Sequence, residues 1–213
     1  MMSLVDLMVG LAMGLNLLAL GSSRVVSVIR AVALQGVLLG MMPLLLEEHF
    51  DWRVALIAVV TMGVKGFVIP ALLGRAMRVA NIEREIEPFI GFIPSLLLGA
   101  VGTLAAVAGA RALPLLPEHA DSLLVPGAIA SVLTGFVLLI GRVKAIAQVC
   151  GYLILENGIY LFGLLLIRST PLLVESGILL DLVVGIFVIG IIVDRIQRAF
   201  DSLDTRKLTV LRE

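Results

Sequence analysis

The chain alternates between long, continuous apolar runs and short polar connections. Seven runs are each about as long as the roughly 20 apolar residues that a helix needs to cross a hydrocarbon core. They fall near residues 3–21, 25–46, 54–74, 90–110, 122–141, 146–167 and 174–194. The runs do not alternate with a period of two, which argues against the strands of a membrane barrel. The pattern predicts an all-α polytopic membrane protein with about seven transmembrane helices.

Composition supports this class and excludes several others. The chain has 213 residues, of which 60% are hydrophobic and 15% charged, whereas soluble domains are nearer half apolar and a quarter charged. The net charge is zero, so the chain has no overall basic field to attract nucleic acid. The single cysteine, Cys150, excludes a disulfide framework, and His49 and His119 are too far apart for metal-ligand spacing. We therefore expect no catalytic residue, no metal site and no cofactor in this chain.

The basic residues predict an orientation, because cytoplasmic connections carry an excess of Lys and Arg. Only three basic residues, Arg53, Arg111 and Arg168, fall in the second, fourth and sixth connections. The other connections and the tail hold Arg24, Arg30, Arg75, Arg78, Arg84, Arg142, Lys144, Arg195, Arg198, Arg206, Lys207 and Arg212. With an odd number of helices, this bias predicts an outside N-terminus and a cytoplasmic C-terminus.

The same pattern divides the chain into four parts. Residues 1–89 form a three-helix transmembrane part with a cytoplasmic loop, and residues 90–121 form a fourth helix with an outside loop. Residues 122–200 form a second three-helix part, and residues 201–213 form a cytoplasmic tail.

Glu156 is the most informative polar residue within the spans. It lies about eleven residues into the sixth run, close to the expected mid-depth of the membrane. Gln148, Tyr152, Glu156 and Tyr160 recur every four residues, which places them on one side of a helix, and Asn157 follows the acid directly. Ionisable residues at this depth are costly and usually mark a path or a site. Glu156 is either a proton relay residue or a buried contact between helices.

Asp181 and Lys65 are the other two ionisable residues placed deep in predicted spans. Gly177 and Gly185 flank Asp181 at four-residue spacing, which lets another helix approach closely. Lys65 lies shortly before Pro70, which lacks the amide hydrogen that a helix needs and predicts a kink. Lys65 can pair with Glu156 or with an acid on another subunit. The uncharged Gln35 is interpreted as a residue that makes a packing hydrogen bond between helices.

The last predicted helices resemble a known membrane subunit. "LENGIYLFG", with Glu156, and "DLVVGIF", with Asp181, look like the two acid-bearing helices of the K-type subunit of respiratory complex I. The related C-type subunit of multisubunit cation/proton antiporters shares this pattern. The chain has aspartate where that family usually has glutamate. Over nearly all of its length, the chain is similar to the component E family, and the most specific match is "AQVCGYLILENGIYLFG". Members of this family are membrane subunits of hydrogenase-4-type complexes, and these complexes include formate hydrogenlyases.

The resemblance implies a non-catalytic membrane subunit of a hydrogenase-4-like oxidoreductase in a bacterial or archaeal inner membrane. It implies that Glu156 and Asp181 belong to a proton-translocation axis, with Lys65 as a third candidate. The implied partners are antiporter-like membrane subunits, an H-type membrane subunit and a peripheral hydrogenase-like arm. A [NiFe] centre and iron–sulfur clusters would then lie on partner subunits. Two alternatives stay open: a subunit of a cation/proton antiporter without a redox arm, and a purely structural scaffold.

Overall fold

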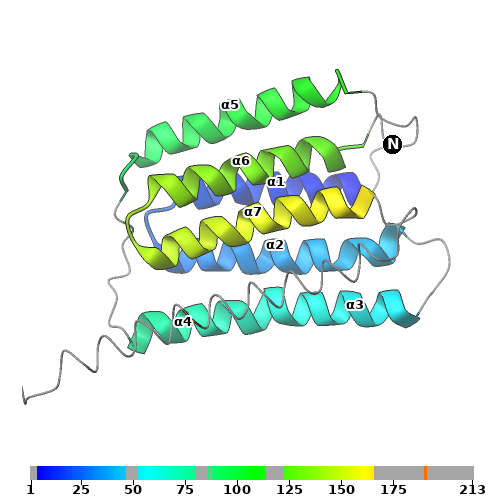
Figure 1. Cartoon of the computed structure of the whole chain (residues 1–213), viewed down its shortest axis with the longest axis horizontal. Helices are drawn as coiled ribbons and strands as arrows, with labels where there is room; N and C mark the ends of the chain where they lie inside the picture. Colours follow the sequence, from blue (N-terminus) through cyan, green and yellow to red (C-terminus); the bar gives the residue numbers. More distant parts are fainter. Residues whose placement is uncertain are drawn as a thin grey trace, which may run out of the picture.

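The computed structural model describes residues 4–46, 52–79, 86, 88–113, 122–165 and 190. Its elements are α1 (Leu4–Gly21), α2 (Val25–Leu46), α3 (Trp52–Gly63), the π-helical turn η1 (Val64–Val68), α4 (Ile69–Val79), α5 (Phe92–Ala110), α6 (Leu124–Gly141) and α7 (Ala145–Leu165). The elements α3, η1 and α4 follow one another without a break and form one rod (Figure 1).

The predicted fold class is confirmed. Within the described ranges, six helices are long and apolar enough to cross a membrane, with α3, η1 and α4 making one span over Val54–Arg78. The chain is a multi-pass membrane protein. The seventh predicted run (174–194, apart from residue 190), Asp181 and the tail (201–213) lie outside the described residues. The orientation and the four-part division remain predictions.

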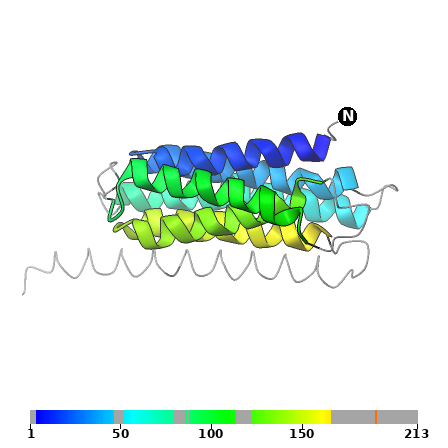
Figure 2. The ribbon, with the colours of Figure 1, turned by 90° about the horizontal axis from the view of Figure 1, so that it is seen from above.

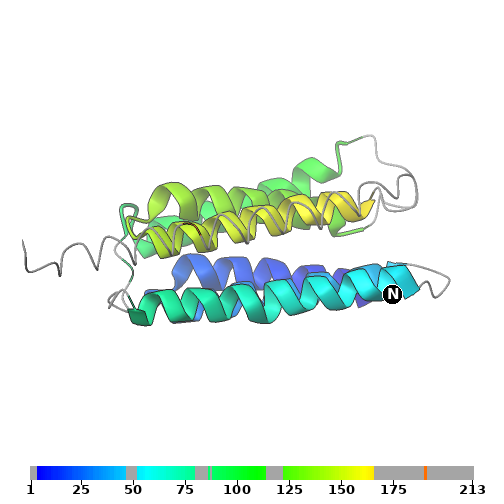
Figure 3. The same cartoon turned by 60° about the horizontal axis from the view of Figure 1, so that its bottom comes forward.

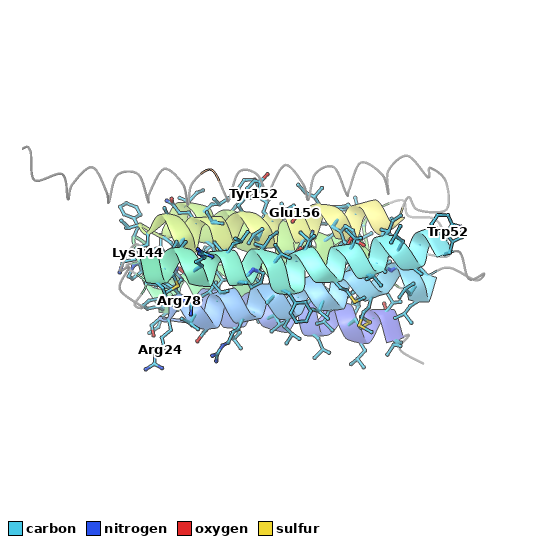
Figure 4. The ribbon with its side chains drawn as sticks, turned by 90° about the horizontal axis from the view of Figure 1, so that it is seen from below. Arg24, Trp52, Arg78, Lys144, Tyr152 and Glu156 are labelled. Atoms are coloured by element: carbon cyan, nitrogen blue, oxygen red, sulfur yellow. The ribbon has the colours of Figure 1, made fainter. Side chains whose placement is uncertain are left out.

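The six spans form two layers of three helices. One layer holds α1, α2 and the α3–α4 rod, and the other holds α5, α6 and α7 (Figure 3). All spans run nearly along one common axis (Figure 2). Between the layers, α1 packs against α5 and α6, and α2 packs against α7. Arg24, Arg78 and Lys144 lie at one end of the bundle and Trp52 at the other (Figure 4).

Glycines set the distance between the most closely packed helices. A Cβ atom added at Gly135 would lie 2.5 Å from Cβ of Leu155, and one at Gly151 would lie 2.8 Å from Cβ of Leu138. Small residues of this kind let membrane helices approach closely. The α6–α7 contact is therefore a glycine-mediated helix pair.

A similar approach joins α2 to the turn that carries Lys65. A Cβ atom at Gly36 would lie 2.6 Å from Cβ of Lys65. In η1 the amide of Ile69 bonds to the carbonyl oxygen of Val64, five residues back, which is a π-helical spacing. Pro70 follows directly, and its ring would clash with the Gly66 carbonyl in a regular α-helix. The wider turn relieves that clash, so the disturbance predicted at Pro70 takes the form of a π-turn.

Arg142 ties the two layers together at the basic end of the bundle. Its side chain is 1% exposed and donates to the carbonyl oxygens of Leu20 (2.6 Å) and Ile90 (2.9 Å) and to the Ser95 hydroxyl (3.3 Å). Its guanidinium also lies over the Phe92 ring, 4.9 Å from the centroid. Desolvation lowers the pKa of Arg142, but an arginine keeps its charge at neutral pH. In the sequence analysis Arg142 was one of the basic residues of the polar connections. In the structure its hydrogen bonds join the end of α1, the α6–α7 turn and the start of α5.

We predict that Gly151→Ala destabilises the protein by about 1–3 kcal/mol, because the added methyl group overpacks the α6–α7 contact. Thermal unfolding of the purified full-length chain in detergent measures the change as a lower Tm. Gly163→Ala is the matched control on the same helix, since a Cβ atom there meets nothing within 4 Å. Equal Tm values for the two variants would contradict the close packing described above.

We also predict that Arg142→Met lowers the free energy of unfolding by several kcal/mol, because each buried acceptor left without a partner costs about 1–3 kcal/mol. The exposed Arg24 provides the control, as Arg24→Met removes the same charge at the same end of the bundle. Similar losses in both variants would show that charge, and not the hydrogen bonds of Arg142, is responsible. The same unfolding measurement decides between them.

Candidate functional site

A thin polar layer crosses the bundle at mid-depth, between two apolar clusters. One cluster, toward the basic end, includes Leu20, Val32 and Ile154, and the other includes Met13, Leu39 and Leu161. Along α1, α2 and α7 the polar residues fall between the members of these clusters. The layer consists of Asn16, Gln35, Lys65, Ser131, Glu156 and Asn157, each 4% exposed or less.

Lys65 and Glu156 form a buried ion pair at the centre of the site. The Lys65 Nζ lies 2.5 Å from the Glu156 Oε1, and the two side chains are 4% and 3% exposed. The π-turn η1 carries the lysine and the middle of α7 carries the glutamate, so the pair joins the two layers. Of the two partners that the sequence allowed for Lys65, the structure selects Glu156. Each charge is costly to bury alone and is compensated by the other.

Two further residues of α7 hold the lysine. Lys65 Nζ donates to the Asn157 Oδ1 at 3.1 Å, and it lies 5.0 Å from the centroid of the Tyr160 ring. A cation over an aromatic face is attracted by the ring's electrons, more strongly when water is excluded. Three side chains within five residues of one helix therefore surround the ammonium.

From Asn157 a chain of hydrogen bonds continues across the bundle. The Asn157 Nδ2 donates to the Gln35 Oε1 at 3.1 Å, and the Gln35 Nε2 donates to the Asn16 Oδ1 at 2.9 Å. The Asn16 Nδ2 then donates to the Ser131 Oγ, also at 2.9 Å. Gln35 also approaches the Ala12 carbonyl oxygen at 3.4 Å. The chain thus links the ion pair to α6 through α7, α2 and α1.

A small cavity adjoins the ion pair. Its lining residues are Val32, Lys65, Ile69, Leu153, Glu156 and Asn157. The room for the centre of a water-sized sphere is about 10 Å³, close to what one water molecule requires. Val32, Ile69 and Leu153 all belong to the apolar cluster toward the basic end, so the cavity opens from the pair on that side.

The four residues predicted to lie on one side of α7, Gln148, Tyr152, Glu156 and Tyr160, form two separate groups in the structure. Tyr152 and Glu156 lie close together along α7 (Figure 4), and Tyr160 contacts Lys65. Gln148 instead donates its Nε2 to the Arg142 carbonyl oxygen at 2.9 Å, about two turns from Glu156. Its hydrogen bond stabilises the α6–α7 turn. Asp181, the second predicted relay residue, lies outside the described residues.

Asn16 and Ser131 are members of the site that the sequence did not single out. Both are neutral, whereas the residues that drew attention within the apolar runs were the ionisable ones. A usable signal existed for Gln35, which lies at the middle of α2, whereas Asn16 lies five residues before the end of α1. Gln35 was interpreted as a packing contact, and it is the central link of the chain.

The chemistry available here is that of protonation and ion pairing. Among the described residues, no group of three or more His, Cys, Asp or Glu side chains is placed to hold a metal ion. A carboxylate, an ammonium and a small cavity at mid-depth can load, release or exchange a charge. Side-chain amides at neutral pH neither gain nor lose protons, so they act on this site by orientation and polarity.

Comparisons with known proteins place the chain in a family. It is 36% identical over 190 residues to the Uncharacterized protein Rv0085 of Mycobacterium tuberculosis, covering 88% of this chain and 86% of that protein. It is 30% identical over 152 residues to Hydrogenase-4 component E of Escherichia coli K12, covering 70% of this chain and 68% of that protein. The Shigella flexneri protein of the same name matches to the same extent. No family model and no solved structure matches the chain.

The identity to component E extends over two thirds of both chains, and the six described spans fit a membrane component. The chain belongs to the hydrogenase-4 component E family.

Proposed function

We propose that the chain is an integral membrane subunit of a hydrogenase-4-like, complex I-related oxidoreductase. In this role it bridges antiporter-like subunits and contributes charged groups at mid-depth to a proton-translocation axis. The support for membership in a hydrogenase complex is the relationship to Hydrogenase-4 component E. The support for a role in proton translocation is one observation: the buried Lys65–Glu156 pair in the polar layer.

The pair suits proton coupling because the Lys65 ammonium has polar neighbours besides the Glu156 carboxylate. If Glu156 takes up a proton, the ammonium of Lys65 keeps the Asn157 oxygen and the Tyr160 ring as neighbours. The cavity beside the pair offers room for one water molecule on the side of the basic end. We assign Glu156 the role of proton acceptor and Lys65 that of its partner, with Asp181 as a second relay residue by resemblance to the K-type subunit.

The proposal includes partners and a place in the cell. The partners are antiporter-like membrane subunits, an H-type subunit and a peripheral hydrogenase-like arm that carries the [NiFe] centre and iron–sulfur clusters. The location is the inner membrane of a bacterium or archaeon. A cation/proton antiporter without a redox arm would use the same ion pair. Copurification of iron–sulfur subunits in mild detergent distinguishes the two assemblies.

A purely structural role for the polar layer is favoured by one specific observation. The amide side chains of Asn16, Gln35 and Asn157 are joined in one continuous hydrogen-bonded chain, as expected of a network that holds helices in register. A scaffold and a relay make different predictions for variants of the ion pair.

We predict that Glu156→Gln in the intact complex lowers redox-driven proton uptake by at least about tenfold, because the amide keeps an oxygen acceptor but cannot carry a proton. Proton uptake is measured with a pH-sensitive dye in inverted membrane vesicles, and subunit content by native gel electrophoresis. Asp6→Asn makes the same chemical change at a helix end, where Asp6 accepts the Leu123 amide. This control should pump normally, and normal pumping by Glu156→Gln in an assembled complex would rule out the relay role.

We further predict that Lys65→Met destabilises the chain by about 3–5 kcal/mol, because it leaves a buried carboxylate without its counter-ion. The double variant Lys65→Met/Glu156→Gln should regain most of this loss, since it buries no net charge. Thermal unfolding of the full chain measures both effects. The double variant in the complex then separates the two roles: a scaffold would restore pumping together with stability, whereas a relay would restore stability alone.

A further inference from the structure

The hydrogen-bonded chain that leaves Lys65 runs in one direction only. Each side-chain amide has one acceptor oxygen and one donor nitrogen. In Asn157, Gln35 and Asn16 the oxygen faces the Lys65 side and the nitrogen faces the Ser131 side. The four bonds measure 3.1, 3.1, 2.9 and 2.9 Å in that order.

The ammonium of Lys65 determines this direction. An ammonium can only donate, so Asn157 must present its oxygen to Lys65 and its nitrogen to Gln35. Gln35 must then present its oxygen to Asn157 and its nitrogen to Asn16. Turning Asn157 or Gln35 over would place two donors face to face on one side and two acceptors on the other, and turning Asn16 over would place its nitrogen against the Gln35 nitrogen. The chain ends at a serine hydroxyl, which can accept without imposing an orientation of its own.

The aligned amides in turn affect Lys65. Amide dipoles that all point their oxygen ends toward Lys65 complement its positive charge, and hydrogen bonds in a chain polarise one another. Burial strengthens the effect, because every member is 4% exposed or less and no solvent screens the dipoles. A residue two bonds away from Lys65 can therefore influence where the ammonium sits.

We propose that Gln35 and Asn16 are positioning residues for the Lys65–Glu156 pair. Through Asn157 they hold the Lys65 ammonium within reach of the Glu156 carboxylate. They carry no proton themselves, because neutral amides do not titrate at physiological pH. The role of this positioning in proton coupling rests on the function proposed above, whereas the positioning itself is a property of the isolated chain.

The sequence offers a direct probe of Lys65. The chain contains three lysines, Lys65, Lys144 and Lys207, so NMR of the side-chain ammonium groups in a chain labelled with ¹⁵N-lysine requires the assignment of only three signals. The full-length chain in lipid nanodiscs is the sample, and Lys65→Met identifies the signal of interest. The measured quantities are the ¹⁵N shift of that signal and the rate at which its hydrogens exchange with water.

Gln35→Leu removes both hydrogen-bonding groups at the centre of the chain while keeping a similar volume. We expect it to shift the Lys65 signal and to speed its hydrogen exchange by roughly tenfold to a hundredfold, the change expected when a buried hydrogen bond to a charged group is weakened. Ser131→Ala, at the far end, should have a smaller effect of the same sign. Because that variant removes only one oxygen atom, it keeps the test available if Gln35→Leu fails to fold.

Gln148→Leu is the matched control. It makes the same substitution in the helix that carries Glu156, but Gln148 bonds to the Arg142 carbonyl oxygen and not to the chain. It should leave the Lys65 signal unchanged. An unchanged Lys65 signal in Gln35→Leu, or an equal shift in Gln148→Leu, would overturn the proposal. This readout does not depend on pumping, so the positioning role and the relay role can fail separately.

Discussion

The Lys65–Glu156 ion pair is the constraint on which the rest of the structure depends. An apolar bundle in a hydrocarbon core offers no bulk water to either charge, so most of the compensation must come from the chain itself. The carboxylate and the ammonium supply most of it, and Asn157 and Tyr160 complete the surroundings of the lysine. The amide of Asn157 in turn requires a partner at mid-depth, which Gln35 provides. One buried pair thus determines the polar positions of neighbouring helices.

The need to compensate the buried charges of Lys65 and Glu156 explains how the two layers of helices fit together. Each span of the first layer contributes one residue to the polar layer: Asn16 from α1, Gln35 from α2 and Lys65 from the α3–α4 rod. Apolar side chains on either side of the polar layer pack without strong directional preference, whereas the hydrogen bonds allow only one alignment of the helices. Glycines then permit the close approach that short hydrogen bonds need, as at Gly36 beside Lys65. Packing brings the layers together, and the polar layer fixes their alignment.

The sequence predicted the fold well because membrane spans are recognised from length and apolarity alone. The predicted ends of the first two spans differ by at most one residue from α1 and α2, and Glu156 and Lys65 stood out because charges are rare at that depth. The same reasoning could not find the rest of the site. Asn16 and Ser131 matter only because distant helices bring them together, and one sequence does not show which helices are neighbours. Gln148 illustrates the converse, since it shares the four-residue spacing of Tyr152 and Glu156 but its amide donates to the Arg142 carbonyl oxygen.

The surroundings of the Lys65–Glu156 pair also bear on how it could be stable and still change its charge. A lone buried ion pair is held by a single attraction, and neutralising one partner leaves the other exposed to the full penalty of burial. Here the ammonium also has two neutral neighbours, Asn157 and Tyr160, and Asn157 is itself hydrogen-bonded to Gln35, which is bonded to Asn16. The carboxylate lies beside a cavity of about one water molecule, on the side of the basic end. In the proposed relay, Glu156 is the member of the pair that changes its charge, and the proposed task of the amide chain is to keep Lys65 in place while it does so.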